Sequence, residues 1–125
     1  MKIEIGATRR VFIFNNFVIK IPNTKEYRLF LSGILANLQE KLWSGSHPDL
    51  AKVKWCSLLG LILIMEKAES IGCCGYFEDE TWDAFQDMLQ ERYKDDELSE
   101  FMLSDPKPSN WGYIGDRLVK IDYGD

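Results

Sequence analysis

The strongest constraint on the fold is a pair of β-rich runs near the N-terminus that are joined by only two residues. The runs are residues 10–14 and 17–21, and Asn15 and Asn16 separate them. Two extended segments with so short a connection pair antiparallel, and asparagine tolerates the positive φ that a tight turn needs. Pro22 ends the second run because proline cannot donate to a strand ladder. We therefore expect the chain to begin with an antiparallel sheet.

The next segment, residues 26–44, has the spacing of a helix with small or apolar residues on two sides. One stripe consists of Ile34, Leu38 and Leu42, and the other consists of Gly33, Ala36, Glu40 and Trp43. This pattern predicts a helix that is buried between layers. Gly45 and Pro48 then end it.

The second half of the chain combines further strands with a second helix. Residues 51–58 and 60–66 are extended runs, and the second is apolar on both faces, which favours a central strand. A loop at residues 71–75 leads to a helix that Asp79 can cap. Its apolar face consists of Trp82, Phe85, Leu89 and Tyr93. Residues 111–114 and 117–122 then form a hairpin around a Gly115-Asp116 turn.

These elements predict an α+β fold in one domain of 125 residues. Its first part, residues 1–68, is an antiparallel β-sheet with a packed helix. Its second part, residues 69–125, is a further helix followed by the C-terminal β-hairpin. The hydrophobic fraction of 46% is sufficient for one core.

Charge and cysteine content exclude several classes of function. Residues 78–100 carry ten acidic side chains and two basic ones, so this surface would repel a nucleic-acid backbone. The cysteines, Cys56, Cys73 and Cys74, are odd in number and no signal peptide precedes them, which predicts a cytoplasmic protein without disulfides. With His47 as the single histidine, the chain has too few ligands for a zinc site. The longest apolar run, residues 58–65, is too short to span a membrane.

Two polar segments near the C-terminus are the strongest functional signal. They are Asp105-Pro106-Lys107-Pro108-Ser109-Asn110 and Asp122-Tyr123-Gly124. Asn110 and Asp122 are twelve positions apart, and a hairpin between them brings its far end back beside its start. Mg²⁺ takes one or two oxygen ligands from a protein and the others from phosphates and water, so this pair can serve as its ligands. Taken alone, the first segment favours a plain polar, proline-rich turn.

Together the two segments resemble the catalytic loop Asp-x-Lys-x-x-Asn and the metal-binding Asp-Phe-Gly turn of protein kinases. The resemblance implies that Asp105 orients the attacking hydroxyl or accepts its proton, and that Lys107 offsets charge on the transferred phosphoryl group. It also implies that Asn110 and Asp122 bind Mg²⁺ beside ATP.

A second resemblance to the kinase pattern lies upstream. Val18-Ile19-Lys20 is similar to the Val-Ala-Ile-Lys of the third kinase strand, and Glu40 on the following helix is its matching ion-pair partner. In the family this pair positions the α and β phosphates. Glu40 also lies on a stripe of small and apolar residues, where a lone carboxylate would be costly without a cation, so we expect Lys20 to pair with it. An exposed strand lysine and a solvated helix carboxylate remain the alternatives.

Gly6-Ala7-Thr8-Arg9-Arg10-Val11 stands where the glycine-rich loop of a kinase would be. Gly6 takes the middle glycine position, whereas Glu4 and Arg9 replace the outer two glycines. The resemblance implies that Gly6 approaches a phosphate and that Val11 covers the adenine. Arg9 or Arg10 could reach the phosphate directly. One glycine still allows the backbone a close approach to an anion.

The run at residues 61–66 resembles the fifth kinase strand, which leads into the hinge. This would make Met65 the gatekeeper and place the backbone from Glu66 to Ala68 against the adenine edge. A plain core strand is the alternative for the same side chains.

The chain departs from the kinase pattern at two places. Leu103 and Ser104 stand where protein kinases have His-Arg, and the sequence ends at Asp125 without a segment similar to the helical substrate lobe. The first hypothesis is therefore a minimal phosphotransferase dependent on ATP and Mg²⁺, acting on a hydroxyl of a protein or a small molecule. The second is a non-catalytic, pseudokinase-like module that binds a host protein or a second copy of itself, similar to short kinase-like proteins of bacteriophages.

Overall fold

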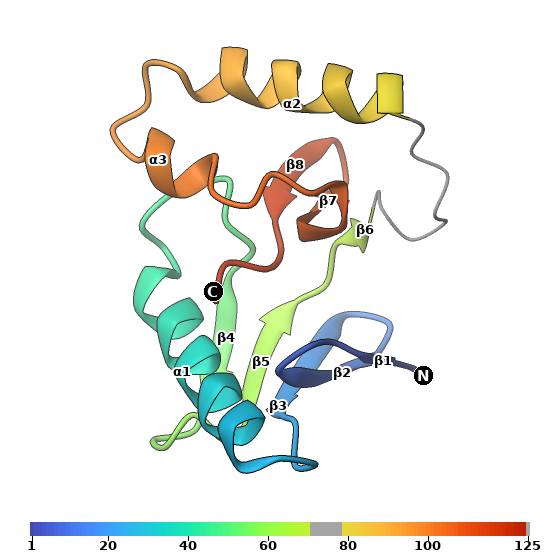
Figure 1. Cartoon of the computed structure of the whole chain (residues 1–125), viewed down its shortest axis with the longest axis vertical. Helices are drawn as coiled ribbons and strands as arrows, with labels where there is room; N and C mark the ends of the chain where they lie inside the picture. The colour runs from blue at the N-terminus through green and yellow to red at the C-terminus, as the bar shows by residue number, and fades with distance from the viewer. Residues whose placement is uncertain (71–78, 125) are drawn as a thin grey trace. The chain divides into compact units, whose positions relative to one another are not determined.

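The computed structural model describes residues 1–70 and 79–124, which form two compact units (Figure 1). Unit 1 contains Met1–Lys67 together with the C-terminal residues from Asp122 onward, and unit 2 contains Ala68–Ile121. The first boundary lies one residue before the predicted one. The return of the C-terminal segment to unit 1 was not predicted, since the sequence analysis assigned it to the second part. The predicted loop at residues 71–75, with Cys73 and Cys74, lies outside the described residues.

Unit 1 is a five-stranded antiparallel sheet with one helix packed on it. The strand order is β1-β2-β3-β5-β4. The strands are β1 (Lys2–Ile5), β2 (Arg9–Ile13), β3 (Phe17–Pro22), β4 (Val53–Cys56) and β5 (Leu63–Glu66). The helix α1 (Tyr27–Trp43) connects β3 to β4. The predicted α+β class and the antiparallel sheet with its packed helix are thus confirmed.

The N-terminal hairpin pairs as predicted, but neither Asn15 nor Asn16 has the positive φ that was expected of its turn. The amide of Phe14 donates to the carbonyl of Phe17 at 2.9 Å, so Asn15 and Asn16 are the two central residues of the turn. β4 and β5 are shorter than predicted because residues 57–62 form a turn between them. Gly60 has a φ of +71° in this turn, a conformation that glycine adopts without strain.

Helix α1 lies against the sheet by one face. Its buried residues are Gly33, Ala36, Asn37 and Glu40. A side chain at Gly33 would place its Cβ 2.5 Å from the carbonyl oxygen of Thr8 and 2.7 Å from Cα of Pro22, so the missing side chain is what lets α1 approach the sheet. The predicted burial of both stripes is wrong, because Leu42 on the stripe with Ile34 and Leu38 is 78% exposed. The fully buried residues of α1 all lie on the face toward the sheet.

Unit 2 is a three-stranded antiparallel sheet with short helical elements around it. The strands are β6 (Glu69–Ser70), β7 (Trp111–Ile114) and β8 (Arg117–Lys120). The helices are α2 (Asp79–Tyr93), α3 (Ser99–Met102) and the 3₁₀ turn η1 (Pro108–Asn110). The predicted second helix and C-terminal hairpin are confirmed, and Gly115 has a φ of +62° at the first central position of the turn.

The core of unit 2 is centred on Trp111, which is fully buried. Its ring lies 5.7 Å from that of Tyr93 and 6.5 Å from that of Phe85, both on α2. Leu89 on the same helix face is also buried, as its spacing predicts. The side chains of Asp79 and Trp82, the proposed cap and first apolar residue, lie outside what the structure describes. Among the described residues no helix has the length and apolar character to cross a membrane.

Candidate functional site

Four of the predicted site residues share one face of the sheet in unit 1. Val11 on β2 is the register partner of Lys20 on β3, and Arg9 lies two positions before Val11. Met65 on β5 pairs with Val18, two positions before Lys20. Because side chains alternate between the faces of a strand, these residues lie on the same face. Glu40 of α1 contacts Lys20, so this is the face that the helix covers.

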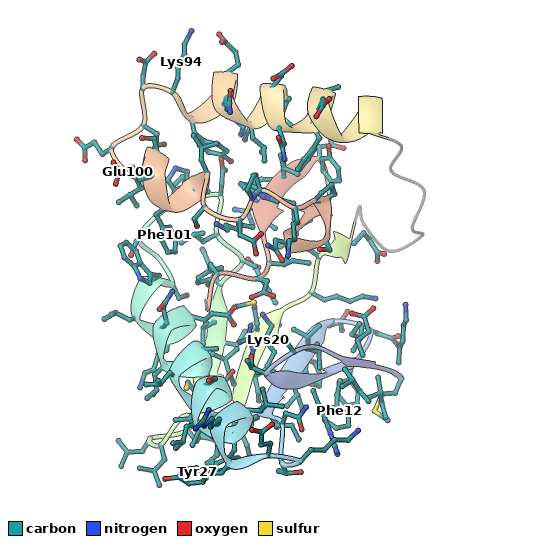
Figure 2. All side chains as sticks on the ribbon, in the orientation of Figure 1. Phe12, Lys20, Tyr27, Lys94, Glu100 and Phe101 are labelled. Carbon is teal, nitrogen blue, oxygen red and sulfur yellow. The ribbon has the colours of Figure 1, made fainter. Side chains whose placement is uncertain are left out.

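Lys20 and Glu40 form the predicted ion pair. The ammonium Nζ of Lys20 lies 3.0 Å from Oε1 and 3.2 Å from Oε2 of Glu40. Glu40 is completely buried and Lys20, which is labelled in Figure 2, is 5% exposed. The alternatives of an exposed strand lysine and a solvated helix carboxylate do not describe these two residues. Their location in the interior makes the pair more sensitive to substitution than a surface pair.

Arg9 is a second cation on the same carboxylate, which the sequence analysis did not predict. Its guanidinium donates to Oε1 of Glu40 at 2.7 Å and to Oε2 at 3.0 Å. It also donates to Oδ1 of Asp122 at 2.9 Å and to Oδ1 of Asn37 at 3.1 Å. A planar guanidinium can bind two carboxylates at once because its donors form a fixed fork. The structure places Arg9, for which contact with a phosphate was predicted, between Glu40 and Asp122.

We call the set of Arg9, Lys20, Glu40 and Asp122 the charge cluster. Burial by itself would raise the pKa of Glu40, but the positive charges of Lys20 and Arg9 and their hydrogen bonds outweigh it and lower that pKa to about 2. Glu40 is therefore ionised at neutral pH. Burial lowers the pKa of Lys20, and the attraction of Glu40 opposes this effect.

The backbone of the C-terminal segment is hydrogen-bonded to side chains of α1. The amide of Tyr123 donates to Oε2 of Glu40 at 3.0 Å, and Nε2 of Gln39 donates to the carbonyl of Tyr123 at 3.0 Å. A Cβ at Gly124 would meet the carbonyl oxygen of Ala36 at 2.7 Å, so glycine permits the close approach. These contacts explain why Asp122 joins unit 1. They also show how the end of the chain reaches the charge cluster.

Tyr123 and Asn37 support the charge cluster, and the sequence analysis missed both roles. The hydroxyl of Tyr123 donates to the carbonyl of Ala51, and burial, together with the charge of Glu40, raises the pKa of this phenol above its usual range. Nδ2 of Asn37 donates to the carbonyls of Lys20 at 3.1 Å and Gly60 at 2.8 Å. The signal for Asn37 was a polar residue between Ala36 and Glu40 on the buried face of the helix.

The remaining predicted site residues of unit 1 lie in the turn after β1 and at the end of β5. The amide of Gly6 donates to the carbonyl of Arg9 at 2.8 Å, which closes a tight turn between β1 and β2. Met65 is completely buried. Oε1 of Glu66 accepts a hydrogen bond from the amide of Lys52 at 2.8 Å. Ala68, the last residue of the proposed hinge, belongs to unit 2.

The residues of the predicted catalytic loop lie together within unit 2. Nδ2 of Asn110 donates to the backbone oxygen of Asp105 at 3.0 Å and to its Oδ2 at 3.1 Å. Nζ of Lys107 lies 3.7 Å from Oδ1 of Asp105, and both of these side chains are more than half exposed. Asp105 has a φ of +43°, which is uncommon for a residue other than glycine. Asn110 holds this conformation by bonding both the backbone and the side chain of Asp105.

No family model, curated protein or solved structure matches this chain. Its function must therefore be interpreted from the geometry of its own residues.

Lys120 anchors the segment that precedes Asp105, another role missed in the sequence analysis. Only 1% of the residue is exposed. Its Nζ donates to the carbonyls of Phe101 and Ser104, each at 2.9 Å, and to Oγ of Ser104 at 3.0 Å. The end of α3 is thus held on β8, directly before the loop that carries Asp105. An alternating strand pattern does not distinguish a buried lysine from an exposed one, so the sequence contained no signal for it.

Of the two predicted magnesium ligands, Asp122 already has a cation beside it, because its carboxylate accepts a hydrogen bond from Arg9. Nδ2 of Asn110 donates to Asp105, and this contact does not involve the amide oxygen that would bind a metal. Within the described part of the chain, no group of three or more His, Cys, Asp and Glu residues could hold a metal ion. A divalent cation at Asp122 would lie close to the guanidinium and be repelled by it.

Proposed function

We propose that unit 1 is a nucleotide-binding module of the protein-kinase type and that its ligand is ATP. The observation that carries this proposal is the buried ion pair between Lys20 on the third strand and Glu40 on the helix that follows. In protein kinases a lysine of the third strand and a glutamate of the next helix form this pair, and the lysine contacts the α and β phosphates.

The burial of the pair supports a functional role. Removing two charges from water costs several kcal/mol for each ion, by the general estimate for buried pairs, and well-packed apolar residues often stabilise a fold as well or better. A buried pair is therefore weak evidence for stability alone. A lysine that must be held at a fixed position to meet a phosphate gives the arrangement a physical purpose.

The apolar residues on the same face support an adenine site beside the charge cluster. Val11 and Met65 lie on the face that carries Lys20, by strand register and alternation. Such residues can cover one side of a planar base, as mostly apolar ligand sites commonly do. The backbone of Glu66, at the end of β5, would then meet the edge of the base.

ATP binding is tested by isothermal titration calorimetry and by thermal unfolding of the whole chain. A ligand at 100 times its Kd stabilises the folded state by about 2.7 kcal/mol, so saturating ATP should raise the unfolding temperature by several degrees. Lys20→Met should abolish the effect, whereas Lys54→Met, at an exposed strand lysine, should retain it. If the Met variant does not fold, Lys20→Arg, which keeps a cation beside Glu40, replaces it in the comparison. The proposal would be disproved if ATP neither stabilised the folded wild-type chain nor gave a heat of binding in the titration.

Phosphoryl transfer is a second candidate function, favoured by the geometry of Asp105. Its carboxylate is exposed and is oriented by Asn110, as the base that accepts a hydroxyl proton would need to be. Incubation with γ-labelled ATP, alone and with host lysate, should then label an acceptor. Asp105→Ala should abolish labelling, and Asp116→Ala, in the exposed turn between β7 and β8, should not. ATP binding without any labelling would favour the non-catalytic module.

The non-catalytic module would act by binding a protein partner or a second copy of itself. Asp83, Asp87 and Glu91 are exposed on α2 and form an acidic surface that suits a basic partner. Binding through this surface should weaken at high salt because exposed charges are screened. Size-exclusion chromatography with light scattering distinguishes a homodimer from a monomer. A monomer would need another protein as its binding partner.

A further inference from the structure

One residue of the charge cluster, Asp122, is accessible to solvent. The side chain of Asp122 is 42% exposed, whereas those of Arg9, Lys20 and Glu40 are 5%, 6% and 0% exposed. A ligand that approaches the cluster from solvent therefore meets the carboxylate of Asp122. An unneutralised carboxylate there would repel a triphosphate.

Arg9 supplies the neutralising charge. The two cations and two anions of the cluster sum to zero, and the removal of Arg9 would leave a net charge of −1. At nucleotide phosphates, divalent cations normally supply this neutralising charge, since they bridge protein oxygens and phosphate oxygens. Here the guanidinium lies 2.9 Å from Oδ1 of Asp122 and is held from behind by both oxygens of Glu40.

We infer that Arg9 takes the place of the divalent cation at Asp122, and that this chain binds nucleoside triphosphates without metal. The inference depends on the proposed nucleotide site and adds its cation requirement. It rests on the observation that Asp122, one of the predicted magnesium ligands, already has a fixed positive charge beside it. Arginine is suited to this position, since its fork binds Glu40 and Asp122 simultaneously, whereas a lysine ammonium is a point charge on a flexible stem.

The test is calorimetric titration of the whole chain with ATP, once in EDTA and once in excess MgCl₂. The inference predicts that the Kd values for ATP in EDTA and in MgCl₂ agree within about threefold, which is well below a tenfold change in affinity. If ATP binds only with MgCl₂, the inference is wrong and the proposed nucleotide site stands. If a folded chain binds ATP in neither buffer, the proposed function fails and the inference fails with it.

Three substitutions locate the effect at Arg9. Arg9→Gln should weaken metal-free binding at least about tenfold, and MgCl₂ should restore much of the loss because Asp122 is then free of its cation. Asp122→Asn removes the charge that needs neutralising, so it should keep metal-free binding. Arg10→Gln is the matched control, because alternation along β2 places Arg10 on the opposite face of the sheet.

Arg9→Gln has a second readout that does not need nucleotide. Titration of the variant with MnCl₂ should show a metal site that the wild-type chain lacks, since the guanidinium no longer repels the ion. If Arg9→Gln does not fold, the double variant with Asp122→Asn should relieve the uncompensated charge and provide the comparison. Metal-free binding of ATP that is identical in folded Arg9→Gln and wild type would overturn the assignment.

Discussion

The substitution Glu40→Gln tests the charge cluster most directly. Glu40 accepts hydrogen bonds from Lys20, Arg9 and the amide of Tyr123, and it is completely buried. Glutamine has nearly the same shape but carries no charge, so the variant leaves two buried cations with reduced compensation. The packing of α1 on the sheet changes little, which isolates the electrostatic contribution.

The expected loss of stability follows from the pKa of Glu40. This pKa falls from 4.5 in the unfolded chain to about 2 in the folded protein. A shift of one unit corresponds to about 1.4 kcal/mol, so the ionised carboxylate contributes about 3 kcal/mol at neutral pH. The general range of roughly 3–5 kcal/mol for breaking a buried pair agrees with this value. With an unfolding entropy of about 2 cal/mol/K per residue, the melting temperature should fall by roughly 10 °C.

The assay is urea unfolding of the wild-type chain and Glu40→Gln over a range of pH. Because the folded pKa is below the unfolded one, the contribution is complete above pH 4.5 and is lost as the pH falls toward 2. The difference in free energy of unfolding should therefore be constant near neutral pH and shrink through that window. The urea midpoint should move while the slope m stays unchanged.

Glu4→Gln is the matched control. Glu4 forms an ion pair with Lys2 at 3.3 Å in which both side chains are more than half exposed, so the same chemical change should have little effect on stability. The reasoning is refuted if the two variants lose similar amounts of stability. A loss in Glu40→Gln that does not diminish between pH 4.5 and 2 would refute it equally.

Three further substitutions test other contacts. Gly33→Ala should destabilise by about 1–3 kcal/mol because the new methyl meets backbone atoms of β3 and of the turn between β1 and β2, whereas Gly6→Ala should be mild since its nearest contact is at 3.4 Å. Lys120→Met should lower stability by about 1 kcal/mol, because three partly buried oxygen acceptors at the end of α3 lose their donor. Tyr123→Phe should lower stability by about 1 kcal/mol through the lost hydroxyl hydrogen bond, and Tyr113→Phe, at a 42% exposed residue, should be neutral.

Each of these outcomes is measured by urea unfolding monitored by circular dichroism. Equal losses in Gly33→Ala and Gly6→Ala would mean that α1 does not approach the sheet as described. A neutral Lys120→Met would show that the acceptors at the end of α3 find water instead. Equal effects of the two tyrosine substitutions would remove the role given to the contact between Tyr123 and Ala51.

Local patterns were sufficient to predict the elements of this protein. A two-asparagine connection between β-rich runs specified the first hairpin, and Gly115 at the start of a two-residue turn specified the last. The buried stripe of α1 was read correctly at Gly33, Ala36 and Glu40, because residues three and four apart share a helix face. The pairing of Lys20 with Glu40 was predictable for a related reason, since a carboxylate on a buried stripe requires a cation.

The sequence alone thus determined the antiparallel sheet, its helix and the ion pair between them, because short-range periodicity and the cost of burying one charge are properties of neighbouring residues. Only the tertiary structure decided that Arg9 binds both Glu40 and Asp122, and that Lys120 and Tyr123 are interior hydrogen-bonding residues. Arg9 and Asp122 are 113 positions apart. No local pattern relates residues at such a separation, and they meet because the closing segment of the chain packs on α1.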